Sequence, residues 1–163
     1  MPERVVATDT EHLTRLIYLA LRKDGLACSL NHIDVSNVTS FDRLFTYSDF
    51  VGDVSEWDVS AGESFRKMFQ SSRFNGDISR WNMEKAQDLS HMFDDAWFTG
   101  DISQWNVANV RAMNGMFKNS PFNGDISKWN VSNVQTFARM FKNSQFNGAI
   151  SNWTIGRADN MLK

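Results

Sequence analysis

The sequence predicts an α/β solenoid, a right-handed coil of stacked strand-helix units, and three observations support this fold class. Apolar residues return every 24 positions along most of the 163-residue chain. Within each interval, a pattern typical of a short strand precedes one typical of a short helix. An amphipathic segment precedes the first interval, where a repeat array needs a cap. We expect one domain overall, with a capping helix over 1–25 and a repeat array over 26–163.

The 24-residue period is visible in several columns, each free of insertions. The Phe column consists of Phe50, Phe74, Phe98, Phe122 and Phe146. The aliphatic column consists of Val54, Ile78, Ile102, Ile126 and Ile150. The Trp column consists of Trp57, Trp81, Trp105, Trp129 and Trp153. Counting back by 24 gives a degenerate first unit at Leu26, Leu30, Ile33, Val35, Phe41, Leu44 and Phe45. The array therefore has six units, of which the last is incomplete.

Each unit is predicted to be a turn, a short strand and a short helix. In the unit at 122–145, the Asn-Gly pair at 123 and 124 indicates a turn, because Gly and Asn tolerate positive φ. The apolar residues from Ile126 to Val131 predict the strand. Four apolar residues lie on one face of the helix expected over 134–141, namely Val134, Phe137, Met140 and Phe141. Elements this short need their neighbours, so parallel strands would stack at about 4.8 Å in a leucine-rich-repeat-like array.

The N-terminal segment predicts the capping helix. Thr8 and Glu11 have the spacing of a capping box, and Gly25 ends the segment. The apolar residues between them form one face, at Leu13, Leu16, Ile17, Ala20 and Leu21. At the other end, only Ile155, Met161 and Leu162 are available to cover the last unit. That edge closes the array with these residues or meets another chain.

The composition argues against nucleic acid and membranes as partners and does not identify another partner. The formal net charge of −2 is too small to attract nucleic acid or an anionic membrane. Cys28 is the only cysteine, so an internal disulfide is excluded. The first residues do not resemble a standard secretion signal, and no apolar run reaches the ~18 residues of a membrane span. These observations favour a cytoplasmic location by default.

The repeated motif FNGDISxWNVSNVxxMxxMF, at 74–93, 98–117 and 122–141, resembles the BspA-like leucine-rich-repeat family of bacterial surface proteins. The segment CSLNHIDVSNVTSFDRLF at 28–45 resembles it too. The resemblance covers residues 10–160 or so. It implies a leucine-rich-repeat fold, a role in binding proteins and a location at the cell surface or outside the cell. It brings no catalytic residues.

The Trp column has two interpretations. Stacked indoles could form a platform for a sugar, a base or a peptide. However, Trp occupies the position of a core residue in the repeat, and Ile33 replaces it in the first unit. We therefore favour a buried ladder with a rung about every 4.8 Å, in which each indole N–H needs an acceptor.

Repeated aspartates follow the turn glycines, at Asp53, Asp77, Asp101 and Asp125. Such a column could bind calcium, but one carboxylate per repeat offers few of the six to eight oxygens that calcium takes. We favour aspartates that accept hydrogen bonds from turn amides. The three histidines, His12, His32 and His91, share no register and have no carboxylate or Cys partner at ligand spacing. We expect no metal site, no cofactor and, without a catalytic motif, no enzyme activity.

Polar residues flank the buried positions of each expected strand and are the candidate partner-binding residues. The column that varies most consists of His32, Glu56, Arg80, Gln104, Lys128 and Asn152. A second column, acidic at first and rich in amides afterwards, consists of Asp34, Asp58, Asn82, Asn106 and Asn130. Variation within a uniform repeat can encode the choice of partner, but exposed positions also drift without a function. The acidic end favours a basic partner.

The sequence thus predicts a non-catalytic protein-protein interaction module that binds another protein through this face, by occlusion or adhesion. Neither nucleic acid nor membrane insertion is expected. The alternative is a structural unit that self-associates, at least weakly, through its C-terminal edge.

Overall fold

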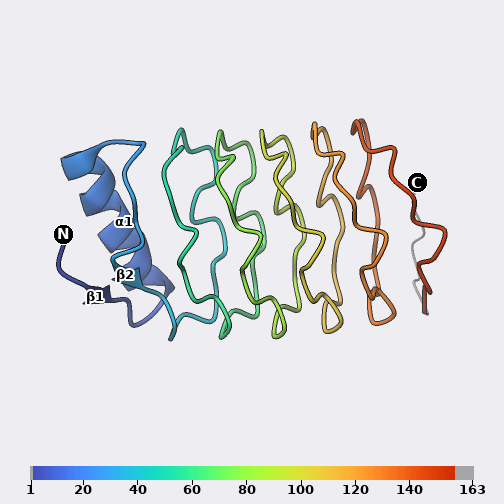
Figure 1. Ribbon diagram of the computed structural model, residues 1–163, viewed down its shortest axis with the longest axis horizontal. Coiled ribbons are helices and arrows are strands. Elements are labelled where there is room, and N and C mark those ends of the chain that lie inside the picture. The colour runs from blue at the N-terminus through green and yellow to red at the C-terminus, as the bar shows by residue number, and fades with distance from the viewer. Residues whose placement is uncertain (1, 157–163) are drawn as a thin grey trace.

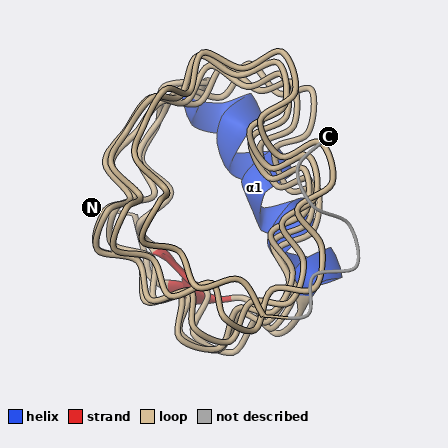
Figure 2. Cartoon of the chain, turned by 90° about the vertical axis from the view of Figure 1, so that its right-hand side faces the viewer, coloured by secondary structure: helices blue, strands red, loops and turns tan. Residues whose placement is uncertain are grey.

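The computed structural model describes residues 2–156, which wind into a coil whose turns stack along one long axis (Figure 1). Helix α1 (Thr10–Asp24) lies at one end, and the turns follow in chain order towards the other end. Strands β1 (Val5–Val6) and β2 (Ile33–Asp34) pair in parallel, so the N-terminal segment lies beside the first turn. Along the axis, successive turns follow nearly one outline, with α1 lying across it (Figure 2). This superposition is what an uninterrupted 24-residue period requires.

Helix α1 is present where the apolar pattern predicts it, but its cap differs. Asp9, rather than Thr8, is the N-cap, and its Oδ1 accepts a hydrogen bond from the amide of His12 at 2.8 Å. The capping box of Thr8 and Glu11 is therefore wrong, because the carboxylate one residue later reaches the free amides of the first turn. Gly25, with φ of 85°, ends the helix. The helix buries Leu13, Ile17 and Ala20 against the first turn.

The repeats do not contain the expected helices. Among the described residues α1 is the only helix, and the segment over 134–141 is a series of tight turns. Alternate amides donate to carbonyls of the next turn of the coil, as Phe117 N does to Met140 O at 2.9 Å. Amides between them bond three residues back, as Met116 N does to Met113 O at 3.2 Å. A helix needs each amide to bond four residues back, so stacking and helix formation compete for the same donors.

The tight turns hold non-glycine residues in the left-handed region, with φ between 52° and 60°. One position per turn holds Arg43, Lys67, His91 and Arg139, and another holds Tyr47, Ser71, Asp95, Asn119 and Asn143. The glycine of the Asn-Gly motif does not have positive φ, contrary to expectation. A Cβ on Gly76, Gly100 or Gly124 would come within 2.8 Å of the ring of the Phe two residues earlier. Glycine is needed there to make room for that ring.

Parallel pairing between turns occurs at a different place from the predicted strands. Single bridges join consecutive members of the column Ser40, Ser64, Asp88, Ala112 and Thr136. The expected strand around Trp129 does not pair, because its amide closes a local turn onto Ile126 O at 3.2 Å. Within residues 2–156, only the first turn has a strand at the expected position. There, β1 supplies the partner for β2.

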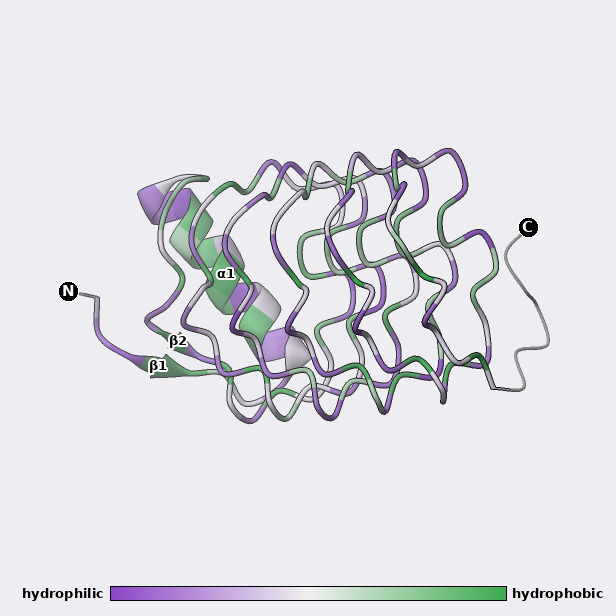
Figure 3. Ribbon diagram, turned by 45° about the vertical axis from the view of Figure 1, so that its right-hand side comes forward, coloured by the Kyte–Doolittle hydropathy of each residue, from purple (hydrophilic) through white to green (hydrophobic). Residues whose placement is uncertain are grey.

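Aromatic side chains form continuous ladders through the core, and hydrophobic segments recur at matching places in successive turns (Figure 3). Phe69 stacks on Phe93 with ring centroids 5.7 Å apart, and Phe93 stacks on Phe117 at 5.8 Å.

Leu26, expected in the Phe column, is instead 48% exposed. It lies directly after the end of α1, and its carbonyl already accepts a hydrogen bond from the Val51 amide of the following turn at 2.9 Å. The start of the expected sixth unit, up to Gly156, is described, whereas Met161 and Leu162 lie outside the described residues.

Candidate functional site

The Trp column is buried, which confirms the interpretation as a core ladder. Its five indoles are at most 8% exposed, and the planes of Trp105 and Trp129 lie within 2° of parallel. Their ring centroids are 6.5 Å apart, more than the expected 4.8 Å, because the rings are stacked with an offset. Each indole N–H donates to a carbonyl in the preceding turn, as Trp57 does to Leu30 O at 2.9 Å. The column is therefore not available as a binding platform.

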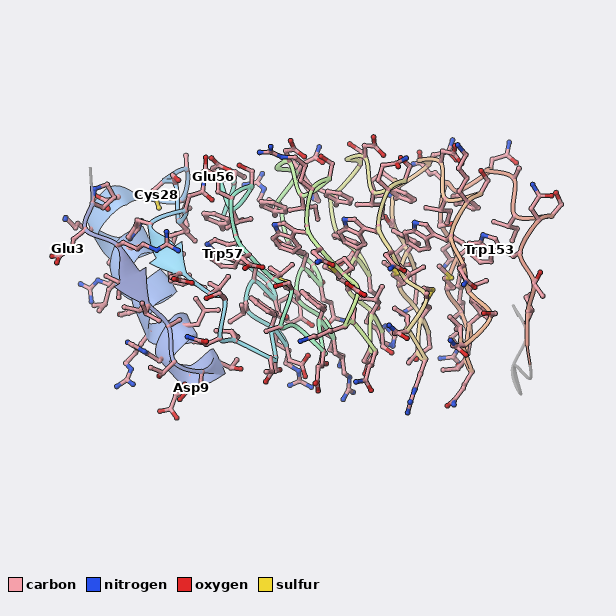
Figure 4. All side chains as sticks on the ribbon, turned by 60° about the horizontal axis from the view of Figure 1, so that its bottom comes forward. Glu3, Asp9, Cys28, Glu56, Trp57 and Trp153 are labelled. Carbon is pink, nitrogen blue, oxygen red and sulfur yellow. The ribbon has the colours of Figure 1, made fainter. Side chains whose placement is uncertain are left out.

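The predicted column of variable residues lies on the outside of the coil. We call it the variable column: His32, Glu56, Arg80, Gln104, Lys128 and Asn152. His32 is half-buried and the other five are exposed. Figure 4 shows Glu56 projecting outwards, while the adjacent Trp57 lies among the side chains of the core. Stacking thus brings side chains of different charge and size together on consecutive turns of the coil.

The second predicted column stabilises turns. Each member accepts, through Oδ1, a hydrogen bond from the amide two residues later, at 3.0–3.2 Å; these are Asp34, Asp58, Asn82, Asn106 and Asn130. This is the Asx-turn arrangement, in which a short side chain replaces a backbone acceptor. We call these residues the Asx column. One oxygen of each is used internally, and the remaining polar atoms of the exposed members face solvent.

The acidic end of the Asx column has a partner within the chain. Hydrogen bonds from Ser36 and from the Arg4 guanidinium, 2.9 Å away, lower the pKa of Asp34 to about 2. Arg4 of the N-terminal segment thus binds the Asp34 carboxylate, which lies at the acidic end that the sequence predicts to favour a basic partner. Glu56 and Asp58 are exposed on the following turn.

A pocket of about 510 Å³ lies at the same end of the variable column. It is lined by Pro2, Arg4, Ser29, Asn31, His32 and Glu56. Asn31 forms its base, donating to Asp53 Oδ2 at 2.8 Å and accepting from the Glu56 amide at 3.0 Å. The Nδ1 atom of His32 is buried and has no hydrogen-bond partner among the described residues. A buried unpaired polar nitrogen is unfavourable for the free energy of folding.

The repeated aspartates form Asx turns, as the sequence predicts. Asp53, Asp77, Asp101 and Asp125 each accept, through Oδ1, the amide of the serine two residues later at 2.8–2.9 Å. Hydrogen bonds from the serine amides and hydroxyls lower the pKa of all four carboxyls. In the described part of the chain, no group of three His, Cys, Asp or Glu side chains could hold a metal ion.

His91 has a carboxylate partner, contrary to the sequence prediction. Its Nδ1 lies 2.9 Å from Oδ2 of the buried Asp94, which also has the Lys118 ammonium at 3.7 Å. Asn114 Nδ2 approaches His91 Nε2 at 3.4 Å, and Ser90 donates to Asn114 Oδ1 at 2.7 Å. Ser90 therefore bonds the amide rather than the imidazole. Among the described residues this closed network lacks the Ser-His contact of a hydrolase triad.

Trp97 is an exposed aromatic residue that the repeat pattern leaves unexplained. It lies outside the Trp column, at the position that other turns fill with Asp49, Arg73, Pro121 and Gln145. It is 58% exposed, and it lines a second pocket with Asp95, Ala96, Asn119 and Pro121. The sequence signal that could have identified this position is one aromatic residue in a column that otherwise contains polar residues and proline.

A family model described as Mycoplasma protein of unknown function, DUF285, matches residues 3–97 and again residues 73–163. The two matches together extend over nearly the whole chain. No curated protein and no solved structure matches it. No helix in the described residues is long and apolar enough to cross a bilayer.

Proposed function

The chain belongs to the family described as Mycoplasma protein of unknown function, DUF285, and we propose that it is a non-catalytic repeat protein that binds another protein. The contact surface is the variable column together with the exposed members of the Asx column. Its repeated motif resembles that of BspA-like repeat proteins, and this resemblance supports a role at the bacterial surface. It works by occlusion or adhesion, as a rigid face laid against the partner.

One observation carries this proposal: residues of different charge and size occupy a single exposed column over a uniform buried scaffold. Glu56, Arg80, Gln104 and Lys128 are exposed on four consecutive turns. The Trp directly after each of them is buried and bonded to the preceding turn. Because the scaffold repeats, these side chains set the charge pattern that a partner meets.

The pocket at His32 suits the end of such an interface. Arg4 and Glu56 provide both signs of charge, and Asn31 and His32 line the pocket beside them. A polar side chain of the partner protein would suit this lining. Anchors that fill pockets contribute much of the free energy of protein association.

The test compares two triple variants that remove the same charges from different surfaces. Glu56→Ala, Arg80→Ala and Lys128→Ala together alter the variable column. Glu63→Ala, Lys85→Ala and Arg111→Ala alter exposed positions elsewhere and serve as the matched control. A partner captured from extracts of the source cells should bind the control triple as it binds the wild type, and bind the variable-column triple at least tenfold more weakly. Equal affinity for both triples would refute this contact surface.

Self-association through the C-terminal edge is a second candidate. Phe141, Phe146 and Ile150 are only partly buried, whereas Phe117, Phe122 and Ile126, their equivalents one turn earlier, are almost fully buried. Part of the apolar surface of the last described turn is therefore open to a second copy. The size of the protein in solution distinguishes this candidate from the first.

A further inference from the structure

The Trp97 ring is held in place from one side. The Arg73 guanidinium carbon lies 4.6 Å from the ring centroid, and Arg73 is itself held by Asp49 at 3.7 Å. The Trp97 amide donates to Ser72 O at 3.0 Å, which fixes the backbone beneath the ring. Its indole N–H makes no hydrogen bond to any described residue, unlike those of the five core indoles. The ring is thus positioned at the surface although it has no role in the core.

The pocket beside Trp97 extends to the next turn of the coil. Its volume is about 380 Å³, within the range of ~300–1,000 Å³ common for small-molecule sites. Pro121, at the equivalent position one repeat later, lines the pocket too. The pocket thus has apolar groups on consecutive turns, the aromatic Trp97 beside Ala96 and the aliphatic Pro121.

Two polar side chains complete the lining, and each has one atom left for a ligand. Asp95 Oδ2 accepts from the Ser71 hydroxyl at 3.1 Å, and Asn119 Oδ1 accepts from Asn143 Nδ2 at 3.2 Å. The other carboxylate oxygen of Asp95 and the amide nitrogen of Asn119 have no partner among the described residues. One is an acceptor and the other a donor, so together they suit hydroxyl groups, which both donate and accept.

The turn that carries this pocket is anchored from beneath. Asp94, next to Asp95, is buried and bonded to His91, with Lys118 close by. The Ala96 amide bonds Phe93 O at 3.2 Å, so the backbone between the network and Trp97 is also fixed. A site built on such a support loses little freedom when a ligand binds.

The charges around the pocket favour a neutral ligand. Arg73 on the ring disfavours a second cation there, and the Asp95 carboxylate disfavours an anion. A ring with C–H groups on one face and hydroxyls at its edge satisfies all of these conditions. We propose that Trp97, Asp95 and Asn119 bind a neutral pyranose sugar, which stacks on the indole and bonds the two polar side chains. This site is separate from the variable column and independent of the function proposed for it.

The test uses the full chain labelled with 5-fluorotryptophan, whose six residues give separate ¹⁹F signals. Trp97→Phe identifies the signal of Trp97. The probes are the methyl glycosides of glucose, galactose, mannose and N-acetylglucosamine, each titrated to tens of millimolar. At least one should shift the Trp97 signal in a saturable way and leave the five core signals in place. If none of them does so, the proposal is wrong.

Variants then locate the contacts, with binding followed by saturation-transfer NMR of the sugar. Trp97→Ala and Asp95→Ala should each weaken binding about tenfold or more. Tyr18→Ala is the matched control, since Tyr18 is also exposed and also has an arginine, Arg22, over its ring at 5.7 Å. Tyr18→Ala should bind like the wild type. Unchanged affinity in Asp95→Ala, or a Trp97 shift produced only by methyl glucuronide or by a proline-rich peptide, would overturn the assignment to a neutral sugar.

Discussion

Gly115 is required by a neighbouring side chain as well as by its own backbone. It occupies the left-handed position that other turns fill with larger residues such as Arg139, with φ of 62°. A Cβ at this position would lie 2.4 Å from two atoms of the His91 ring on the preceding turn. The imidazole, which is bonded to the buried Asp94, cannot move away without losing that bond. His91 and Gly115 therefore depend on each other.

We expect Gly115→Ala to lower the free energy of unfolding by about 1–3 kcal/mol, from the steric conflict added to left-handed strain. Denaturant unfolding of four proteins measures this: the wild type, each single variant and the His91→Ala/Gly115→Ala double variant. With the ring removed, the same glycine substitution should lower stability by the ~1 kcal/mol of backbone strain alone. An equal loss in both backgrounds would show that the ring does not matter.

For single residues, the sequence predicts the roles of side chains that recur in every repeat and misses the roles of those that occur in one repeat. The buried Trp ladder and the Asx turns followed from columns of identical residues. Arg43, Lys67 and Arg139 gave no signal of a left-handed position, because Arg and Lys do not normally indicate positive φ. Asp and Asn at the other left-handed position tolerate positive φ, but they are also typical of turns in general. The pairing of His91 with Asp94 depends on a turn whose shape comes from contacts between repeats. Trp97 was visible as an exception, but its exposure and its contact with Arg73 depend on stacking.

The repeated Asx turns make the stability of the fold depend on pH in the acidic range. The folded-state pKa values of Asp77, Asp101 and Asp125 are lowered below the ordinary value of 3.8, so each carboxylate stabilises the fold when ionised. This contribution is complete above about pH 5 and is lost as the pH falls through the lowered pKa values. Asp34, with a pKa of about 2, extends the loss to lower pH.

We expect the triple variant Asp77→Asn, Asp101→Asn, Asp125→Asn to lose less stability than the wild type between pH 5 and pH 2. Asparagine keeps the Oδ1 acceptor of the turn but cannot be protonated in this range. Thermal unfolding at a series of pH values measures the difference. The matching triple alanine variant, which removes the acceptor as well, should be less stable than the wild type at pH 7. Parallel pH curves for the wild type and the asparagine triple would contradict the role of these carboxylates.

At the scale of elements, the sequence predicted which residues face the core better than it predicted their backbone. Val134, Phe137 and Met140 are buried as the helical pattern requires, yet they lie on tight turns. A spacing of three suits a coil of three-residue turns as well as one face of a helix. The choice between them depends on the amides that bond the next turn, and one repeat in isolation does not contain that information. The expected strand failed for the same reason.

At the scale of the whole molecule, the two ends of the coil differ. Helix α1 and strand β1 cover the first turn, whereas the last described turn leaves Phe141, Phe146 and Ile150 partly open. The 24-residue register and the cap over 1–25 were predictable from periodicity and amphipathic spacing. The contact of β1 with β2 was not, because two residues of strand carry too little pattern to identify.

If the variable column provides the function, we expect one copy of the chain per particle at all concentrations. Sedimentation velocity from micromolar to near-millimolar protein measures this. The control is Phe146→Glu, which places a charge on the open C-terminal edge and should leave the sedimentation of a monomer unchanged. A concentration-dependent dimer that Phe146→Glu abolishes would instead favour assembly through that edge.

Contacts between turns join residues about one repeat apart, from 21 to 27 positions, and interior turns make the same contacts on both sides, as Phe93 does with Phe69 and Phe117. The fold therefore has no preferred length, and gain or loss of a whole repeat would leave every remaining column in register. Each such event would move the His32 pocket and Trp97 apart, or together, by one pitch of the coil. The number of repeats therefore sets the distance between the two sites, and the coil can serve as a spacer of adjustable length.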